Sequence, residues 1–589
     1  MCGFIGHFAD GGGAKSRSMQ PMQHRGPDAR GEWLSYDNRC WLGHVRLSIL
    51  ELTEAGSQPM VSASGRTVMA FNGEIYNHME VRRSLRQVAW RGHADTETLV
   101  EAWEQEGPGC LEKLRGMFAF AVYDVEAKRL DLVRDRLGIK PLYFRKEADA
   151  GLSFGSEVRA LNEGRRPALG DDALCTYLTT GHLPSAGEMG EGFCALPAGS
   201  LLRVDGQSGL RVQRWWPRGK LDALQFSSRD EAVRQLRDLV EDSVREHLLA
   251  DVPVSVFLSG GTDSSVISVA AAKTASEPLR TFSVGFPQKG LDERPHARRV
   301  ARRIGARHTE IEVNADDCIS WIVEGVRRMD LPSADAVNSF IVSHAVRDAG
   351  LKVALSGLGG DELFGGYPSF FDVPKISWLR HLPRGVAESV VGILPAKFRT
   401  KLDGVSGFDA YSLALGRRRW WAREDLAASG VEGKAAWPEL SAEPLDEFAA
   451  VSWAEMLGYM DPMLLRDSDQ MSMAVSLELR VPFLDHRLVE FALSVPERFK
   501  RGGVKRLLVD AFIEDLPREV WDRPRQGFVL PMDDWMRGPL REFSREGLES
   551  AKRRLDPKWV DGVARRFERG DLHWTRLWQL VVLGHYMRG

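Results

Sequence analysis

The chain has 589 residues, which is too many for a single hydrophobic core, so we expect two domains. A formal net charge of −3 excludes the strongly basic profile of a nucleic-acid-binding protein, so we expect no nucleic-acid partner. Six scattered cysteines form no CxxC pair, so we expect neither disulfides nor a zinc site. No apolar run could span a membrane and no signal-peptide layout opens the chain, so we expect a cytoplasmic protein without a membrane partner.

The first notable residue is Cys2, which Gly3 follows. A small residue after the initiator methionine usually allows the methionine to be removed, which would leave Cys2 with a free α-amine beside its thiol. An α-amine has a reference pKa of about 7.7 to 8.0, so it can serve as the base for a thiol near neutral pH. Cys2 is therefore a candidate nucleophile, although a cysteine at this position more often has no catalytic role.

From residue 1 to about 205, short apolar runs alternate with Gly, Asn and Asp turns, a pattern that predicts an antiparallel sheet-rich domain with a few helices, one of them at 97–105. Three polar clusters interrupt this pattern at Arg46, at Asn72-Gly73-Glu74 and at Asp95. One arginine with two carboxylates could bind the α-carboxylate and ammonium of an amino acid. The Asn72 amide and the Gly73 N–H could form an oxyanion hole. Taken singly, each cluster also fits a structural role as an ion pair, a hairpin turn or a helix N-cap.

Six motifs of this region occur in a recognisable order: CGFIG at the N-terminus, HRGPD at 24–28, GHVRLSI at 43–49, FNGEIYN at 71–77, DTE at 95–97 and DRLGIKPLYF at 135–144. In order and spacing they resemble the N-terminal-nucleophile (Ntn) glutamine amidohydrolase domain of class II amidotransferases. The resemblance implies an αββα sandwich in which Cys2 attacks the glutamine carboxamide and Asn72 and Gly73 hold the oxyanion. The glutamine-binding residues that it implies are Arg46, Leu47, Asn72, Gly73, Glu74 and Asp95. We interpret HRGPD and DRLGIKPLYF as structural loops.

The strand pattern ends in a Gly-, Pro- and Arg-rich segment at 196–220, and helical periodicity begins at Ser228. We therefore place a domain boundary near 210–225, which gives domains of residues 1–215 and 216–589.

The second domain opens with VPVSVFLSGGTDSSVIS at 252–268. Val254, Val256 and Leu258 predict a buried parallel strand, Ser259-Gly260-Gly261 a turn, and Ser264 the start of a helix. Backbone N–H groups and a helix N-terminus converging on one point favour a phosphate or pyrophosphate. The loop is neither a Walker P-loop nor GxGxxG. SGGxDS after an apolar strand is similar to the signature of the ATP pyrophosphatases, which split ATP to AMP and pyrophosphate.

Further alternation follows, with a strand at 280–286, a helix at 292–304, a strand at 309–313 and a strand near 352 that leads into SGLGGDELFGGY. The alternation predicts a parallel, doubly wound sheet with ligands at the carboxyl ends of its strands. Asp263 and Asp361 would then lie on either side of one magnesium-pyrophosphate. Asp361 also fits a helix N-cap.

From about residue 370 onward the chain reads as mainly helical, with two conspicuous motifs, SMAVSLELRVPFLD at 472–485 and GGVKRLLVDAF followed by RPRQGFVLP at 502–531. Lys505 could neutralise the charge of the adenylating transition state or of departing pyrophosphate. Together with the glutaminase motifs, the whole chain resembles the glutamine-hydrolysing asparagine synthetases of the B type.

That resemblance implies that the C-terminal domain adenylates aspartate with ATP and Mg²⁺ and that ammonia travels through an internal channel to displace AMP. The catalytic residues that it implies are Cys2, Asn72, Gly73 and Lys505, and the metal residues are Asp263 and Asp361. The ATP-binding residues that it implies are Leu258, Ser259, Gly260, Gly261, Thr262, Asp263, Ser264, Ser265, Val284, Ser356 and Gly357. The expected partners are these small-molecule substrates, and a homodimer is left open.

One position departs from the family pattern. The second acidic loop commonly reads SGEGxDE, with the glutamate implicated in forming the aspartyl adenylate, and Leu358 occupies that position here. Since leucine can neither orient nor deprotonate a substrate, amidation of another carboxylate, a sugar acid or a peptide, is the alternative to asparagine synthesis.

Overall fold

The computed structural model describes residues 2–588 except 87, 148–150, 206–208, 218, 220, 276, 286–292, 394–395, 403–404, 406 and 524–529. Some of the elements and motifs predicted from the sequence include residues outside these ranges. The end of the strand predicted at 280–286, the start of the helix predicted at 292–304 and most of RPRQGF lie outside the described residues.

The N-terminal part contains thirteen described strands in two antiparallel sheets. They are β1 (Gly3–Phe8), β2 (Ala29–Leu34), β3 (Cys40–Arg46), β4 (Met60–Val61), β5 (Thr67–Ile75), β6 (Gly116–Asp124), β7 (Arg129–Arg134), β8 (Tyr143–Lys146), β9 (Leu152–Gly155), β10 (Gly187–Gly190), β11 (Phe193–Ala195), β12 (Ser200–Asp205) and β13 (Gly209–Arg214). One sheet has the order β10-β11-β8-β9-β1-β3-β2 and the other β13-β12-β7-β6-β5-β4. Alternating apolar residues such as Phe4, Tyr123 and Leu132 fill the space between the sheets, which joins them into a sandwich.

Helices cover both outer faces of this sandwich. α2 (Asp95–Glu106) packs on β5 with α1 (His78–Ser84) beside it, while α3 (Val158–Leu161) and α4 (Asp171–Thr180) pack on the other sheet. The predicted αββα arrangement and the helix predicted at 97–105 are confirmed, although the helix extends beyond both predicted ends.

The following part is built on a five-stranded parallel sheet. Its strands are β14 (Val254–Phe257), β15 (Arg280–Gly285), β16 (Arg307–Glu312), β17 (Val353–Leu355) and β18 (Glu478–Arg480), in the order β16-β15-β14-β17-β18. The associated helices are α5 (Arg229–His247), α6 (Thr262–Thr274), α7 (Arg294–Arg303), α8 (Ala315–Arg328) and α9 (Ala336–Asp348). The doubly wound parallel sheet is confirmed, and its strand order reverses between β14 and β17, where ligands of such sheets bind.

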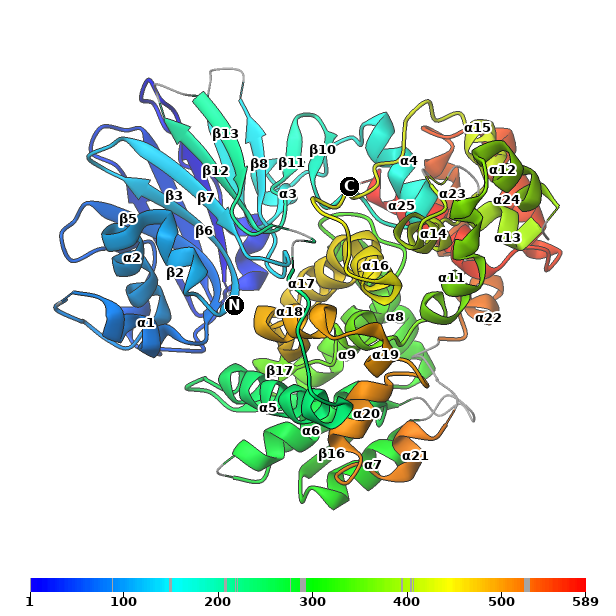
Figure 1. Cartoon of the computed structure of the whole chain (residues 1–589). Helices are drawn as coiled ribbons and strands as arrows, with labels where there is room; N and C mark the ends of the chain where they lie inside the picture. The colour runs from blue at the N-terminus through cyan, green and yellow to red at the C-terminus, as the bar shows by residue number, and fades with distance from the viewer. Residues whose placement is uncertain are drawn as a thin grey trace.

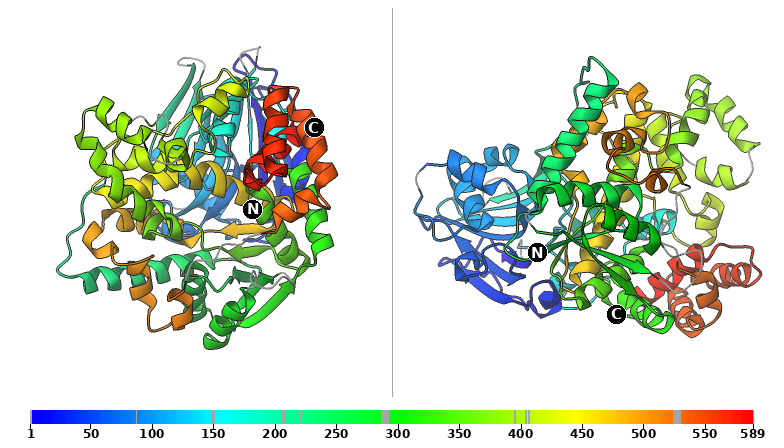
Figure 2. Two further views of the ribbon diagram at one scale, coloured as in Figure 1. Left: turned by 90° about the vertical axis from the view of Figure 1, so that its right-hand side faces the viewer. Right: turned by 90° about the horizontal axis from the view of Figure 1, so that it is seen from below.

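The remainder is helical, as predicted, apart from β18. Its helices are α10 (Gly360–Phe364), α11 (Ser369–Ile376), α12 (Arg384–Gly392), α13 (Ala396–Leu402), α14 (Ala410–Arg417), α15 (Arg423–Ala428), α16 (Glu447–Glu455), α17 (Arg466–Met473), α18 (His486–Ser494), α19 (Glu497–Lys500), α20 (Arg506–Phe512), α21 (Arg518–Trp521), α22 (Met532–Arg537), α23 (Arg541–Ala551), α24 (Pro557–Glu568) and α25 (Trp574–Tyr586). Figures 1 and 2 show the sandwich on one side of the molecule, with the parallel-sheet part and the C-terminal helices packed beside it.

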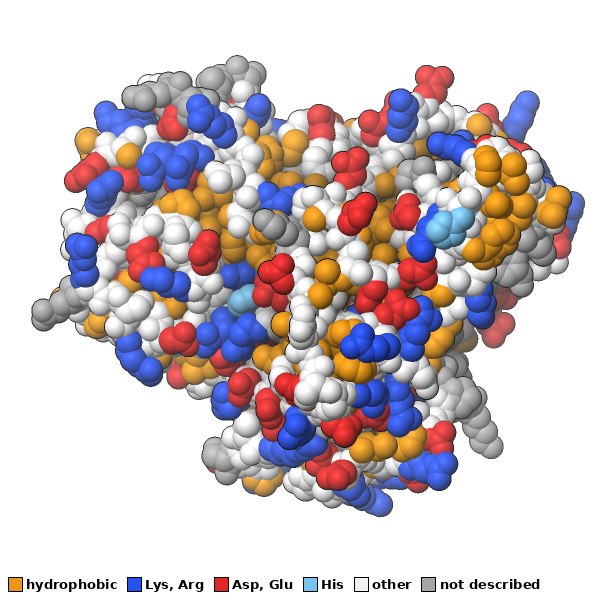
Figure 3. Space-filling model, viewed as in Figure 1, with side chains coloured by type: hydrophobic (Ala, Val, Ile, Leu, Met, Phe, Trp, Pro, Cys, Tyr) orange, Lys and Arg blue, Asp and Glu red, His pale blue; other side chains and the backbone are white. Residues whose placement is uncertain are grey.

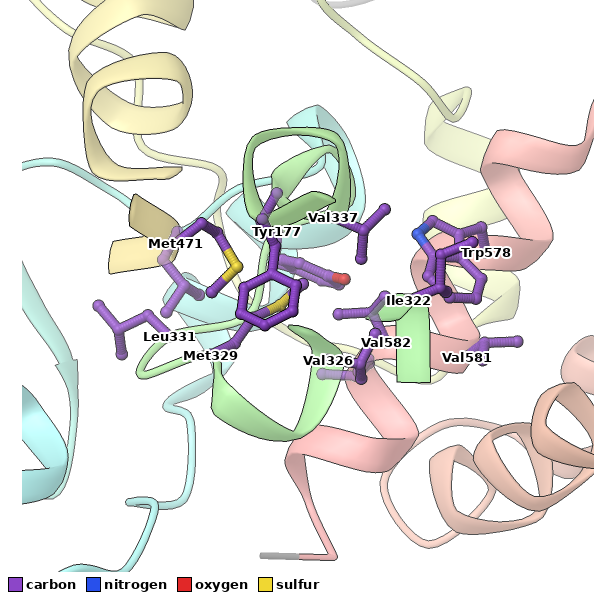
Figure 4. Close-up of a cluster of buried hydrophobic side chains, with 14 of the residues drawn as sticks. Tyr177, Ile322, Val326, Met329, Leu331, Val337, Met471, Trp578, Val581 and Val582 are labelled. Atoms are coloured by element: carbon purple, nitrogen blue, oxygen red, sulfur yellow. The ribbon is translucent and has the colours of Figure 1, made fainter. Parts of the chain in front are cut away.

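The sandwich and the helical part share a continuous apolar core. Figure 4 shows Tyr177 of α4 among side chains such as Ile322 of α8, Met471 of α17 and Trp578 of α25. The Tyr177 hydroxyl, buried with its ring, donates to the Gln579 carbonyl at 2.9 Å. Because buried apolar side chains of both parts pack together in one core, we expect the two parts to hold a fixed relative position.

Candidate active sites

Cys2 lies just before β1 and is only 8% exposed. Its backbone N–H donates to Asn72 Oδ1 at 3.2 Å, and Arg25 Nε donates to its carbonyl at 3.1 Å. Burial raises the pKa of the Cys2 thiol, while a hydrogen bond from the Leu47 backbone N–H and the charge of Arg46 act in the opposite direction. The thiol therefore needs a nearby base, and a free α-amine on Cys2 would lie against the Asn72 side chain.

Asn72 and Gly73 lie next to each other on β5. Since Asn72 Oδ1 accepts from Cys2, its Nδ2 is the donor end, and this buried nitrogen has no hydrogen-bond partner among the described residues. A Cβ at position 73 would lie 2.1 Å from the Met117 carbonyl oxygen of β6, so only glycine fits there. A buried unpaired N–H donor next to a cysteine is what an oxyanion hole requires.

Arg46 ends β3 and is held by the loop that follows it. Its guanidinium donates to the carbonyl oxygens of Thr53 at 2.9 Å and Leu50 at 3.4 Å, and also contacts that of Glu51. These neutral acceptors fix the orientation of the buried guanidinium without neutralising its charge, so the charge remains available to a carboxylate.

Glu74 and Asp95 are buried close to the same strand end. Asp95 accepts the backbone N–H groups of Ile75 at 2.9 Å and Thr96 at 2.7 Å, and burial raises its pKa to about 6. Burial also raises the pKa of Glu74 well above its ordinary value, which the charge of Arg480 opposes. Both carboxyls are placed to gain from a cationic ligand, because an ammonium group would stabilise their ionised forms.

The SGGTDSS loop connects β14 to α6, which begins at Thr262, two residues earlier than predicted. Gly260 has φ +79°, and a Cβ there would lie 2.5 Å from the Ala297 backbone nitrogen, so the turn requires glycine. Ser264 Oγ accepts the Ser259 N–H at 3.2 Å, and no side chain caps α6. The N-cap residue Gly261 thus leaves the first N–H groups of α6 without a side-chain cap, and an anion could bind there.

The other predicted ATP residues lie next to this loop. Val284 is on β15, the neighbour of β14, and Ser356 and Gly357 directly follow β17 on its other side. A Cβ on Gly357 would lie 2.8 Å from the Asp263 Cβ, so the two glycine-rich loops touch. Arg523, to which the sequence interpretation gave no role, donates to the Gly260 carbonyl at 3.1 Å and fixes the turn from outside.

Lys505 joins the two acidic loops. Its Nζ contacts Asp263 Oδ2 and lies 2.5 Å from Asp361 Oδ1, and the lysine side chain is almost fully buried. Lys505 has φ +51°, a conformation that costs energy in a non-glycine residue and that the surrounding structure enforces. The structure thus brings Lys505, Asp263 and Asp361 together at the point where the strand order reverses.

Two family models match the chain. The glutamine amidotransferase domain matches residues 1–216 and asparagine synthase matches residues 235–588. The chain belongs to the asparagine synthase family. It is an ATP-dependent amidotransferase ligase.

Three individual relatives match between 60% and 98% of this chain. A putative asparagine synthetase (glutamine-hydrolyzing) of Mycobacterium tuberculosis (strain ATCC 25618 / H37Rv) is 31% identical, covering 98% of this chain and 93% of that protein. The asparagine synthetase (glutamine-hydrolyzing) 1 of Bacillus subtilis (strain 168) is 30% identical, covering 94% and 90%. The asparagine synthetase B (glutamine-hydrolyzing) of Escherichia coli (strain K12) is 34% identical, covering 60% and 61%.

In this asparagine synthase family member, Arg480 connects the two sites. Its guanidinium, fully buried, donates to Glu478 at 2.6 Å and lies 3.2 Å from Glu74 of the glutaminase site. Its backbone carbonyl accepts the N–H of Ser356, a predicted ATP residue, at 2.8 Å. The SLELRVPFLD motif is conspicuous in the sequence, but only the fold shows that its arginine reaches the other domain.

Other buried ion pairs lie between the two parts of the synthase. Arg25 of the HRGPD motif contacts Asp469 of the other part at 2.8 Å and Glu157 of its own part at 3.2 Å, and Lys140 lies 3.5 Å from Asp469. The interpretation of HRGPD as a structural loop agrees with these contacts, although Arg25 also holds the carbonyl of Cys2. Because separating a buried ion pair costs several kcal/mol, the pairs that cross the interface favour one relative position of the two parts.

Leu358 packs against the apolar cluster that contains Leu258 and Leu355. The carboxyl that remains buried in its loop is Glu362, which accepts the Tyr367 hydroxyl at 2.7 Å. Burial, with the Asp361 charge, raises the pKa of Glu362 to about 7. This loop therefore combines an apolar residue at position 358 with a buried carboxyl whose pKa lies near neutral pH.

Within the described part of the chain, we find no helix with the length and apolar content needed to cross a membrane. On the face shown in Figure 3, acidic and basic side chains are interspersed over both parts of the molecule.

Proposed function

We propose that this synthase releases ammonia from glutamine at Cys2 and transfers it to aspartate that has been activated as an acyl adenylate. The products are then asparagine, glutamate, AMP and pyrophosphate. The supporting observation is that Lys505 contacts both Asp263 and Asp361 at the ends of β14 and β17 in a chain whose Cys2 faces an unpaired amide donor. We place the boundary between the two catalytic domains after residue 215, because β13 ends at Arg214 and α5 begins at Arg229.

In the glutaminase step, the Cys2 thiol loses its proton to the α-amine, and the sulfur attacks the glutamine carboxamide carbon. The Asn72 Nδ2 and the Gly73 N–H donate to the oxyanion. Collapse of the tetrahedral intermediate expels ammonia with the proton from the amine, and water then cleaves the thioester to give glutamate. Arg46 would bind the substrate carboxylate, with Leu47 beside it, while Glu74 and Asp95 would accept from the substrate ammonium.

In the synthetase step, the aspartate carboxylate attacks the α-phosphorus of ATP, and pyrophosphate leaves. The residues assigned to ATP are the SGGTDSS loop, Val284, Ser356 and Gly357, with Lys505 placed to neutralise charge on the transferred phosphate. Ammonia then attacks the acyl carbon of the adenylate and AMP departs. The internal channel through which ammonia would travel remains a prediction.

The donor set at the synthetase site fits Mg²⁺. Asp263 and Asp361 present hard carboxylate oxygens to one position, which Lys505 Nζ contacts. Among the described residues, no three or more His, Cys, Asp or Glu side chains form a group that could hold a metal ion without other ligands. Mg²⁺ commonly keeps waters and phosphate oxygens as ligands, so two carboxylates suffice to hold it with pyrophosphate, where it would neutralise the departing charge.

A single incubation tests the function. The purified enzyme is given ATP, Mg²⁺, aspartate and glutamine labelled with ¹⁵N in its amide, and AMP and labelled asparagine are followed by mass spectrometry. Equal amounts of AMP and labelled asparagine support the proposal. Glutamate release without asparagine or AMP would reject aspartate and favour another carboxylate, the alternative to which Leu358 points.

A further inference from the structure

A cavity of about 400 Å³ lies where the sandwich meets the end of α8 and the C-terminal helices, and none of its lining residues belongs to either candidate active site. It is lined by Arg159, Gly164, Arg166, Arg327, Glu546, His585 and Arg588. Four of these seven residues are arginines, and the arginines come from three separate segments of the chain. The volume lies in the range of small-molecule sites.

One of the arginines is part of the framework. Arg166 Nη2 donates to the carbonyl oxygens of Arg327 at 2.7 Å and Met329 at 3.0 Å, and Nη1 donates to that of His585 at 3.1 Å. This guanidinium therefore ties the sandwich to the C-terminus of α8 and to α25. Its carbonyl partners are neutral, so its positive charge remains in the wall of the cavity.

Two further arginines, Arg159 and Arg327, add positive charge to the lining. Among the described residues, Arg159 Nε is buried without a hydrogen-bond partner. The charge of Arg159 does act on the carboxylates of Glu157 and Asp330. A buried unpaired N–H donor is costly, because it has lost water and gained nothing in return. An acceptor supplied by a ligand would remove that cost.

The nearby acids offset only part of this positive charge. Glu157, whose carboxylate interacts with Arg159, already pairs with Arg25 at 3.2 Å. Glu546, the carboxylate of the lining, pairs with Arg588 at 2.5 Å. Asp330, which lies behind Arg159, accepts the backbone N–H groups of Val158 at 2.8 Å and Arg159 at 2.7 Å. His585 stacks on Phe543, and burial lowers its pKa, so it adds no charge at pH 7.

We infer that this cavity binds a small polyanion, with Arg159 and Arg327 as its principal contacts. Planar guanidinium groups recognise phosphate and carboxylate oxygens through paired N–H donors. Three arginines from both parts of the enzyme line this space of about 400 Å³. A phosphate ester and a polycarboxylate share this chemistry. The ligand would contact both α3 of the sandwich and the end of α8, so its binding would stabilise the junction between them.

The test measures binding of inorganic phosphate and of citrate to the full-length enzyme by isothermal titration calorimetry and by thermal unfolding, against chloride at equal ionic strength. The variants are Arg327→Gln and the double variant Arg159→Gln with Arg327→Gln. The matched control is Arg545→Gln on α23, where the arginine is exposed and pairs with Glu542 outside the cavity. Arg327 is exposed and bonds to no described side chain, so its single variant should fold normally.

We expect saturable stabilisation of the parent and of the control by phosphate, by citrate or by both. Each arginine removed should weaken binding by about tenfold or more, since a charge-assisted hydrogen bond contributes about 1.5–3 kcal/mol. Tighter binding of phosphate would identify a phosphate-bearing ligand, and tighter binding of citrate a polycarboxylate. Equal binding by the parent and both cavity variants, or effects no larger than those of chloride, would overturn the inference.

Discussion

Arg480 offers the most direct test of how the two active sites are held together. Its guanidinium is fully buried between Glu478 and Glu74, and two further carbonyl oxygens, those of His247 and Leu249, accept its Nη1 at 2.8 and 2.6 Å. Burial raises the pKa of Glu478, but neighbouring positive charges, with Arg480 among them, outweigh burial and lower that pKa to about 2. The variant Arg480→Gln would leave two buried carboxylates without this cation.

Removing one partner of a buried ion pair costs about 3–5 kcal/mol, so the free energy of unfolding should fall by about that amount. The pKa of Glu74, already raised by burial, should rise further, because the opposing charge of Arg480 is lost, and the neutral form becomes more favourable. A neutral Glu74 attracts the substrate ammonium more weakly, so KM for glutamine should rise while ammonia-dependent synthesis persists. Urea unfolding followed by tryptophan fluorescence, together with the two activities, measures these effects.

The matched control is Arg487→Gln, seven residues further along the chain. Arg487 pairs with Asp485 and Glu246, but its side chain is 29% exposed, so we expect a loss of only about 0–1 kcal/mol. Adding Glu74→Gln to Arg480→Gln should recover part of the lost stability. If Arg480→Gln cost less than about 1 kcal/mol, or left KM for glutamine unchanged, the reasoning from buried charge would be refuted.

Four further predictions concern the catalytic groups. Cys2→Ala should abolish glutamine-dependent amidation and retain ammonia-dependent amidation, and residual glutaminase activity would contradict the nucleophile assignment. Asp361→Asn should reduce both amidations by at least about a hundredfold while glutaminase activity persists, as measured by AMP and glutamate release. Lys505→Met should have the same pattern, and full ATP turnover would exclude its role. Because burial raises the pKa of Asp95 to about 6, a plot of log kcat/KM for glutamine should steepen below pH 6 as this carboxylate becomes neutral, and Asp95→Asn should lose the extra slope.

The sequence by itself predicted a candidate glutaminase site and determined the type of each sheet. Alternating apolar residues predict a sandwich, and continuous apolar runs that enter glycine loops predict a parallel sheet, because burial on one or both faces imposes those patterns. The adjacency of Cys2 and Asn72 could be expected only from the motif set, since 70 residues separate them. Strand ends in the parallel sheet were predictable to within a few residues, as local turn chemistry sets them.

Other features depend on contacts that no local pattern encodes. β18 is three residues long and too short to show a strand period, so only its pairing with β17 reveals it. The contact of Arg480 with Glu74 crosses from one domain to the other, and the cavity around Arg159 draws its arginines from three distant segments. Tertiary packing decides such contacts, because a buried charge is stabilised by an opposite charge or a ligand that is close in space. That partner is usually distant in the sequence.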